Sequence, residues 1–263
     1  GSLEHFLLPG IEALQFYFHG VLNMDSKRML GRRTTWVAVL LGVIGLAAGT
    51  KFPDFENPFP GGSWYNMVTE ALSSKTVIFL VPVVAVLPYG DVWIGEKTSG
   101  FLKFYVMRKG KKEFIADRLL TTTFSGCFVW GMAIVVTLLF NFAVFYPREL
   151  TAEWNWELMI PLFQTAARVL FVAAILADIS GIMALLSNSV YMAYGIPFVG
   201  YYLMIILHER YLQDVYVIDP QSWIKAAGDW GEDSTGLWMF LFLLLAFLMF
   251  LYGGVLYDRC REI

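Results

Sequence analysis

Residues Leu237 to Tyr257 read LWMFLFLLLAFLMFLYGGVLY, a run without a charged side chain that decides the fold of the chain. The hydrocarbon core of a bilayer is about 30 Å thick, and an α-helix needs roughly 20 apolar residues to cross it. Comparable apolar runs precede this one, at residues 34–50, 76–94, 117–146, 161–186 and 190–207. The sequence therefore predicts an all-α, polytopic membrane protein with six transmembrane helices.

The composition is typical of a chain that lies in lipid. Hydrophobic residues make up 57% of the 263 residues and charged residues only 16%, which is too little polar surface for a water-soluble domain. We expect residues 1–263 to form one transmembrane domain, because the spans leave no room for another. The net charge is −3 and the basic residues lie at helix ends, so the expected partner is the lipid bilayer and not nucleic acid.

The run at 76–94 is the least regular of the six, because Pro82, Pro88 and Asp91 interrupt it. A membrane helix tolerates proline where neighbouring helices or polar side chains satisfy the freed carbonyl group. We therefore expect this run to form a kinked span.

Lys and Arg are distributed unequally between the two sides of this topology. The loops on the side of the chain termini carry 13 of them and the opposite loops carry 5. Short cytoplasmic loops are enriched in basic residues, so we expect both termini in the cytoplasm and the protein in the plasma membrane.

Two segments outside the spans have a recognisable character. Residues 3–33 combine an apolar stretch, too short to cross the bilayer, with basic residues, and we expect an interfacial amphipathic N-terminal helix there. A packed or frayed terminus is the simpler alternative. Residues 208–236 form the longest outer loop and mix Trp, Pro and acidic residues, which favours short helices that dip partway into the membrane.

The cytoplasmic segment from Asp91 to Arg118 reads DVWIGEKTSGFLKFYVMRKGKKEFIADR. Charged residues alternate there with aromatic and aliphatic ones, and this pattern favours a short amphipathic helix on the membrane surface with charges available to a partner. The alternative interpretation is a topology loop whose basic residues bind only anionic lipid head groups.

The same segment resembles the region between the second and third helices of ABC-2 type transporter permeases. The resemblance rests on Glu96, the run Gly100-Phe101-Leu102-Lys103, and the basic residues Arg108, Lys111 and Lys112, which lead directly into a long third span. The interfacial N-terminus, the short turn Ser187-Asn188-Ser189 and the long loop before the last span are also similar to that family.

The resemblance implies a coupling helix within 95–112 that fits a cleft in a separate ABC ATP-binding subunit. The residues expected to couple the two proteins are Glu96, Gly100, Phe101, Lys103, Arg108, Lys111 and Lys112. Glu96 is expected to pair with a basic residue of the ATPase or to cap the coupling helix. ATP and Mg would bind the ATPase. A second permease copy, identical or related, would complete the transporter.

Compact permeases of this family resemble exporters of, or immunity factors against, peptides such as bacteriocins, lantibiotics and phenol-soluble modulins. The expected function is therefore that of the membrane-spanning subunit of an ATP-driven exporter, which moves an amphipathic or peptide-like cargo outward.

Residues 90–98, GDVWIGEKT, come close to the phosphate-binding loop G-x-x-x-x-G-K-[ST]. Glu96 separates Gly95 from Lys97, which displaces the lysine and adds negative charge where phosphates should lie. We therefore expect no cofactor and no enzymatic activity in this chain, and we assign ATP hydrolysis to the partner.

Arg168 and Asp178 are ionisable residues within the fourth span, where burial of charge is expensive and often functional. They are ten residues apart, roughly 15 Å along a helix and on different faces, so each needs another partner. For Arg168 the alternatives are extension to the outer interface and contact with cargo. Asp178 is expected to bind a neighbouring helix or to line an inner vestibule.

Neither a metal site nor a catalytic site is expected. His5 and His19 fall on the cytoplasmic side and His208 on the outer side, and the HERYL sequence lacks the second histidine of an H-E-x-x-H site. Ser125-Gly126-Cys127 has no base nearby to activate a nucleophile.

Two other function classes remain open. A stand-alone secondary transporter or channel would need polar or broken helices that face each other near the midplane. An integral membrane enzyme would need acid, base or metal residues at one depth.

Overall fold

A computed structural model of the chain describes residues 25–51, 61–149, 156–231 and 234–261. The N-terminal part of the predicted interfacial segment, residues 3–24, lies outside the described residues. Its last part, from Asp25 on, forms a short helix and the start of the first long one.

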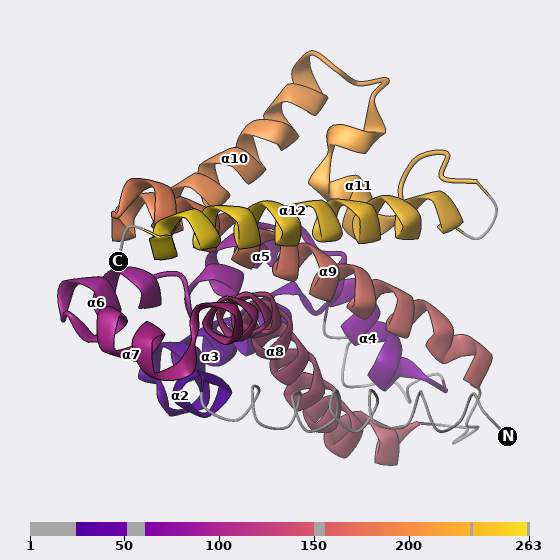
Figure 1. Cartoon of the computed structure of the whole chain (residues 1–263). Coiled ribbons are helices and arrows are strands. Elements are labelled where there is room, and N and C mark those ends of the chain that lie inside the picture. Colours follow the sequence, from indigo (N-terminus) through magenta and orange to yellow (C-terminus); the bar gives the residue numbers. More distant parts are fainter. Residues whose placement is uncertain (1–24, 52–60, 150–155, 232–233, 262–263) are drawn as a thin grey trace, which may run out of the picture.

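The described chain is all-helical, as predicted, and contains no strand (Figure 1). Its elements are α2 (Asp25–Gly31), α3 (Arg33–Gly49), α4 (Ser63–Leu72), α5 (Lys75–Val86), α6 (Val92–Thr98), α7 (Phe101–Lys109), α8 (Lys111–Phe145), η1 (Tyr146–Arg148), α9 (Trp156–Ser187), α10 (Val190–Arg210), η2 (Tyr216–Ile218), α11 (Pro220–Lys225) and α12 (Thr235–Arg261).

Four of these helices, α8, α9, α10 and α12, are long and apolar enough to cross a membrane. Two bent pairs reach the same length and composition when each pair is taken together: α2 with α3, bent by 64°, and α4 with α5, bent by 68°. Within the described residues the chain thus has four to six candidate spans, which agrees with a membrane-embedded protein.

The prediction of one span over 76–94 is wrong at its C-terminal end. Helix α5 runs through Pro82 but ends at Val86, and the chain turns before α6 begins at Val92. Pro88 has no amide hydrogen to continue the helical ladder. At the other end Ser74 caps α5 by accepting a hydrogen bond from the Val77 amide at 3.3 Å, which fixes the bend from α4.

Helix α9 is the central helix of the bundle. Of its most apolar stretch of 18 residues, 72% is buried inside the structure, and the corresponding share is 39% for α8, 22% for α10 and 17% for α12. Helices α8, α12, α10, α5 and α4 all pack against it. The apolar sides of α10 and α12 therefore face outward, towards lipid or another chain.

The loop after α10 contains the short helical elements that its composition predicted, η2 and α11. Asp219 caps α11, because its carboxylate accepts hydrogen bonds from the amides of Gln221 at 3.1 Å and Ser222 at 3.0 Å. Their depth in the membrane stays a prediction.

The contact between α8 and α9 depends on a residue without a side chain. A Cβ atom on Gly126 would lie 2.5 Å from the carbonyl oxygen of Ala173 and 3.2 Å from Cβ of Ala177. The closest heavy atom to a Cβ on Gly131, also in α8, is 3.9 Å away, on Leu170. Glycine at 126 thus sets how closely the two helices approach, as small residues do in membrane bundles.

We predict that Gly126→Ala lowers stability by about 1–3 kcal/mol, because the added methyl group must push α8 away from the α9 backbone. Gly131→Ala is the matched control and should leave stability unchanged or raise it by up to about 1 kcal/mol through helix propensity. Thermal unfolding of the purified protein in detergent, followed by size exclusion, measures both. Equal midpoints for the two variants would contradict the assigned packing.

Candidate functional site

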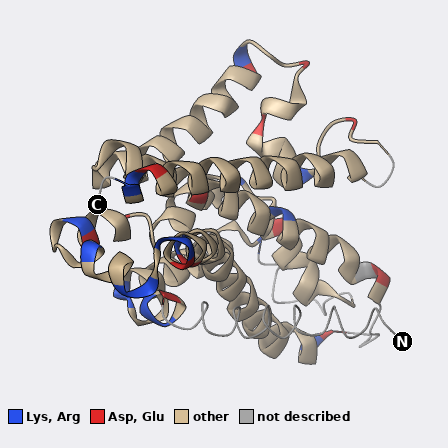
Figure 2. Cartoon of the chain, viewed as in Figure 1, with Lys and Arg blue, Asp and Glu red and all other residues tan. Residues whose placement is uncertain are grey.

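The segment α6–α7 lies at one end of the bundle, next to α2 and the start of α8. Figure 2 shows Lys and Arg gathered at this end. Two glycines with left-handed or positive φ delimit α7: Gly100 at φ 70° before it and Gly110 at φ 87° after it. The predicted coupling segment 95–112 thus consists of part of α6, all of α7 and the first residues of α8, and not of a single helix.

Helix α7 has two distinct faces. Leu102, Tyr105 and Val106 are buried against the bundle. On the other side Phe104 is 69% exposed and Met107 64% exposed. A helix this short holds its position through its buried face and the groups beneath it, because its intrinsic stability is low.

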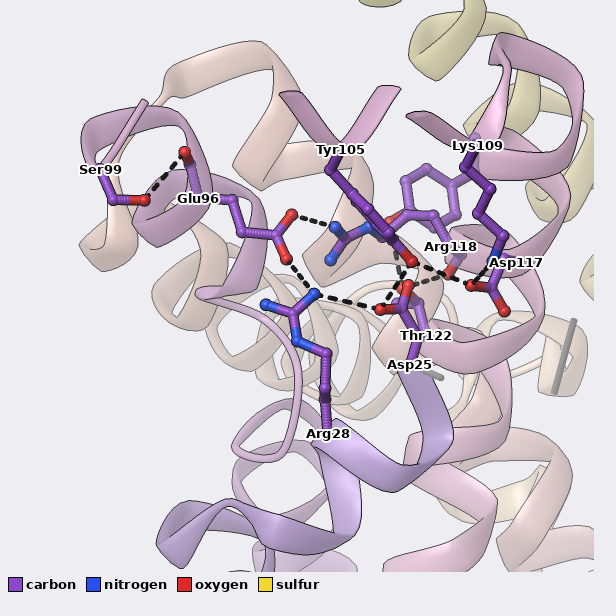
Figure 3. Close-up of polar contacts among 10 residues, drawn as sticks. Asp25, Arg28, Glu96, Ser99, Tyr105, Lys109, Asp117, Arg118 and Thr122 are labelled. Atoms are coloured by element: carbon purple, nitrogen blue, oxygen red, sulfur yellow. Dashed lines mark hydrogen bonds and ion pairs between the residues drawn. The ribbon is translucent and has the colours of Figure 1, made fainter. Parts of the chain in front are cut away.

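A buried ion pair attaches α6 to α8. The Arg118 guanidinium donates a hydrogen bond to the Glu96 carboxylate, and both side chains are almost fully buried (Figure 3). Arg28 of α2 reaches the other carboxylate oxygen of Glu96 at 2.9 Å. One carboxylate therefore links three helices.

A second set of contacts attaches α7. The Tyr105 hydroxyl lies 3.1 Å from a carboxylate oxygen of Asp25 and 3.3 Å from one of Asp117 (Figure 3). Lys109, the last residue of α7, pairs with Asp117. Arg28 also contacts Asp25, at 3.2 Å, and this joins the two sets into one network.

The network, called here the charge cluster, balances formally, with three carboxylates against three cations. Its charged members are Asp25, Glu96, Asp117, Arg28, Lys109 and Arg118. Burial and the neighbouring carboxylates of Asp25 and Asp117 raise the pKa of Tyr105 above its ordinary value, so its hydroxyl stays a hydrogen-bond donor at neutral pH. Buried charges of this kind are tolerated only when each keeps its partner.

An exposed hydrogen bond also ties this segment to α9 and α10. The Lys97 ammonium at the end of α6 donates a hydrogen bond of 2.7 Å to the side-chain oxygen of Asn188, in the turn between α9 and α10.

The residues predicted to couple to an ATPase lie in three different settings. Glu96 is inside, where its partners are Arg28 and Arg118 of its own chain, and it lies within α6 and caps no helix. Gly100 is the joint between α6 and α7. The others are exposed around α7 and the start of α8: Phe101, Lys103, Arg108, Lys111 and Lys112.

Sequence reasoning missed most of the charge cluster. The sequence alone assigns no individual role to Arg118, Asp25, Tyr105 or Asp117. One signal was present: Asp117 and Arg118 are adjacent charges at the start of a long apolar run, where each needs a partner. The partners on α2 are distant in sequence and could not be inferred.

Arg168 lies in α9 and is 7% exposed, so its side chain is not extended to the surface. Its guanidinium donates a hydrogen bond of 2.9 Å to the Thr165 hydroxyl, and among the described residues it forms no salt bridge. A role for Arg168 in cargo contact stays a prediction.

Asp178 is fully buried in α9 and, as expected, binds a neighbouring helix. One carboxylate oxygen accepts a hydrogen bond of 2.7 Å from the Thr123 hydroxyl of α8, while the other has no hydrogen-bond partner among the described residues. It does not meet Arg168, in agreement with the helical spacing.

The near-match to a phosphate-binding loop adopts a different structure. Gly95, Glu96 and Lys97 lie within helix α6 and do not form a loop after a strand. In the described part of the chain no three His, Cys, Asp or Glu side chains are grouped to hold a metal ion. His208 lies 3.8 Å from the Asp219 carboxylate, while His5 and His19 fall outside the described residues.

Comparison with known protein families and with curated proteins finds no match to the chain.

We predict that Glu96→Gln lowers stability by about 3–5 kcal/mol, because it leaves the buried Arg118 without its counter-charge. The double variant Glu96→Gln with Arg118→Met should recover much of this loss, since it removes both buried charges. Thermal unfolding in detergent measures the effect.

The matched control is Lys103→Gln, which changes an exposed charge on α7. It should leave the unfolding midpoint nearly unchanged, as surface charges contribute little. If Glu96→Gln unfolds at the temperature of Lys103→Gln, the charge cluster does not hold α6 in place.

Proposed function

We propose that this protein is the membrane-spanning permease subunit of an ATP-driven ABC exporter and that α7 is its coupling helix. The observation that carries the proposal is the two-sided character of α7. Its inner side is held to α8 by the ion pair of Lys109 with Asp117 and to α2 by the hydrogen bond from the Tyr105 hydroxyl to Asp25. On its outer side Phe101, Phe104 and Met107 are exposed, together with the basic side chains of Lys103 and Arg108. Exposed aromatic and methionine side chains are enriched at protein interfaces.

The connection between α7 and the bundle suits the transfer of motion. Lys109 is the last residue of α7, and Arg118 lies in the N-terminal part of α8. Each is paired with a buried carboxylate. A push on the outer face of α7 therefore acts on α8, a single helix from Lys111 to Phe145. Rigid-body rocking of helices joined in this way is a common form of conformational switching.

In this proposal α7 faces the cytoplasm, with both chain termini on the same side in the plasma membrane, and six spans result from counting each bent helix pair as one. A separate subunit binds ATP and Mg, and a second permease copy, identical or related, completes the pathway. The cargo is amphipathic or peptide-like and moves outward. The gathering of Lys and Arg at the α2, α6 and α7 end supports this orientation (Figure 2).

The alternative is that this end of the protein only binds anionic lipid, and a cavity of about 510 Å³ beside the charge cluster argues against it. Its arginines are already paired, Arg28 with Glu96 at 2.9 Å and Arg32 with Asp91 at 2.8 Å. Lipid phosphate would have to compete with these carboxylates.

A second candidate function, a stand-alone transporter, draws on Asp178. Inside a span, a buried carboxylate with one oxygen that meets no donor in the described part of the chain is a candidate ion or proton site. Reconstituted protein that moves a solute down its gradient without an ATPase would favour this candidate over the exporter.

We predict that an ATP-binding protein with a complete phosphate-binding loop copurifies with the chain from its native membranes. Phe104→Glu should weaken that association about tenfold or more, because it places a charge at the centre of the exposed apolar face of α7. Quantitative mass spectrometry of the copurified ATPase measures the ratio.

The control for Phe104→Glu is Tyr211→Glu, a similar change at a side chain that is 75% exposed at the end of α10. It should leave the copurified ATPase unchanged. Equal loss in both variants, or an unchanged ratio in Phe104→Glu, contradicts docking on α7.

Sidedness is tested separately by cysteine labelling. After replacement of Cys127 and Cys260 by Ala, a cysteine at Lys103 should react with a membrane-impermeant maleimide only in inside-out vesicles. A cysteine at Asp214, exposed in the loop after α10, should react only in intact cells. The reverse pattern would overturn the proposed orientation and with it the exporter.

A further inference from the structure

The cavity beside the charge cluster is open at one side and lies where α2, α6 and the start of α7 meet. It encloses about 510 Å³, within the range of small-molecule sites, about 300–1,000 Å³. Four charged side chains contribute to its lining: Arg28, Arg32, Asp91 and Glu96. The cavity therefore presents both signs of charge to one ligand.

The two arginines keep hydrogen-bond donors for an anion. Arg28 contacts Glu96 at 2.9 Å and Asp25 at 3.2 Å, both through Nη1, and its side chain is 40% exposed (Figure 3). Arg32 reaches the two carboxylate oxygens of Asp91, each at 2.8 Å, through Nη2 alone. A guanidinium carries five N–H donors in a fork that matches phosphate. Both arginines can therefore donate to a phosphate group without leaving their carboxylates.

Asp91 is the acceptor that a cation in this cavity would meet. Its side chain is 29% exposed, whereas that of Glu96 is 6% exposed and turned towards Arg118. Asp91 contacts Arg32 and the Tyr194 side chain of α10, and a carboxylate has about four lone-pair sites. It can thus accept a further hydrogen bond from the cavity side.

The formal charges around the cavity balance. The charge cluster has three charges of each sign, and the pair of Arg32 with Asp91 adds one more of each. An anion alone would place a negative charge beside Asp91 and Glu96, and a cation alone would place a positive charge beside two arginines. A zwitterion satisfies both signs and leaves the balance unchanged.

The position of the cavity indicates that the ligand is a lipid. Arg32 directly precedes α3, where exposed apolar side chains follow at steps of four residues: Trp36 is 50% exposed, Leu40 59% and Ile44 53%. The Trp36 indole donates a hydrogen bond of 2.8 Å to the carbonyl oxygen of Leu30, next to the joint that lines the cavity. Tryptophan with one polar and one apolar side is typical of the membrane interface. The cavity thus lies at the depth of lipid head groups, with an apolar surface for acyl chains beside it.

We propose that this cavity binds the head group of a zwitterionic phospholipid, with its phosphate at Arg28 and Arg32 and a primary ammonium group at Asp91. The acyl chains lie along the exposed apolar side of α3. Phosphatidylethanolamine has this chemistry, whereas the quaternary ammonium of phosphatidylcholine has no N–H to donate. The site goes beyond the proposed exporter function and needs no ATPase, so either can fail without the other.

The test is native mass spectrometry of the purified full chain in detergent, titrated with dioleoyl lipids that differ only in their head group. We expect phosphatidylethanolamine to bind at least about fivefold more tightly than phosphatidylcholine or phosphatidylglycerol, because it alone pairs with both signs of charge. Soluble glycerophosphoethanolamine has the same head group without acyl chains. It should bind about a hundredfold more weakly or less, because it buries no hydrocarbon.

The ammonium contact is tested by Asp91→Asn. This variant should lose the preference for phosphatidylethanolamine and bind it like phosphatidylcholine, whose own affinity should stay the same. Asp214→Asn, at an exposed acidic residue in the loop after α10, is the matched control and should keep the wild-type preference.

Gly95 allows a variant that blocks the cavity and leaves its charged side chains in place. Gly95 lines the cavity, and a Cβ atom there would meet no heavy atom within 4 Å. Gly95→Trp should weaken binding of phosphatidylethanolamine several-fold, and it tests the site even where Asp91→Asn does not purify as a single species. Gly200→Trp, at a glycine of α10 with equally open surroundings, is the control and should not weaken binding.

Four results overturn the proposal. Equal affinity for phosphatidylethanolamine and phosphatidylcholine shows that Asp91 binds no ammonium group. Tighter binding of phosphatidylglycerol assigns the cavity to anionic lipid. Equal effects of Gly95→Trp and Gly200→Trp show ordinary contact with surrounding lipid. Glycerophosphoethanolamine that binds as tightly as the lipid assigns the cavity to a water-soluble ligand.

Discussion

The buried ion pair between Glu96 and Arg118 is the interaction on which the arrangement of this protein's basic end depends. Two charges removed from water are stable only while they face each other, so α6 has essentially one position against α8. Arg28 and Asp25 then bring α2 to the same place, and α7 follows through Tyr105. The position of α7, and with it the surface that α7 exposes, thus depends more on these buried polar contacts than on the helix propensity of its own residues.

Hydrophobicity made the long helices predictable. The run from Leu237 to Tyr257 has no charge to end it, and α12 covers it with a few residues to spare. The break in the second predicted span was harder to place, because Pro82 and Pro88 look alike in sequence while only the second lies where α5 stops. Which proline a helix runs through depends on the neighbours that satisfy its carbonyl groups, and these belong to the tertiary structure.

The exposed character of the segment 95–112 was predictable from the sequence, but the partners of its charged side chains were not. Alternating charges and aromatic residues marked 95–112 as a surface segment, and α7 exposes Phe104 and Met107 as an amphipathic element should. Glu96, by contrast, belongs to the interior. The partners of a carboxylate are the basic side chains close to it in space, and Arg28 and Arg118 are 68 and 22 residues away from Glu96 in the sequence. The sequence therefore did not show that the Glu96 side chain faces the interior.

The contacts at the basic end differ in how easily they break, and the hydrogen bond between Lys97 and Asn188 is the weaker kind. It lies in water, where one hydrogen bond is easily exchanged for another with solvent, whereas the pair beneath α6 has no solvent to replace a lost partner. The hydrogen bond between Lys97 and Asn188 therefore breaks more easily than the ion pair that holds α6 against α8. The end of α9 still stays attached to this region, because Ile182 and Leu185 share a buried apolar cluster with Trp93 of α6 and Leu102 of α7.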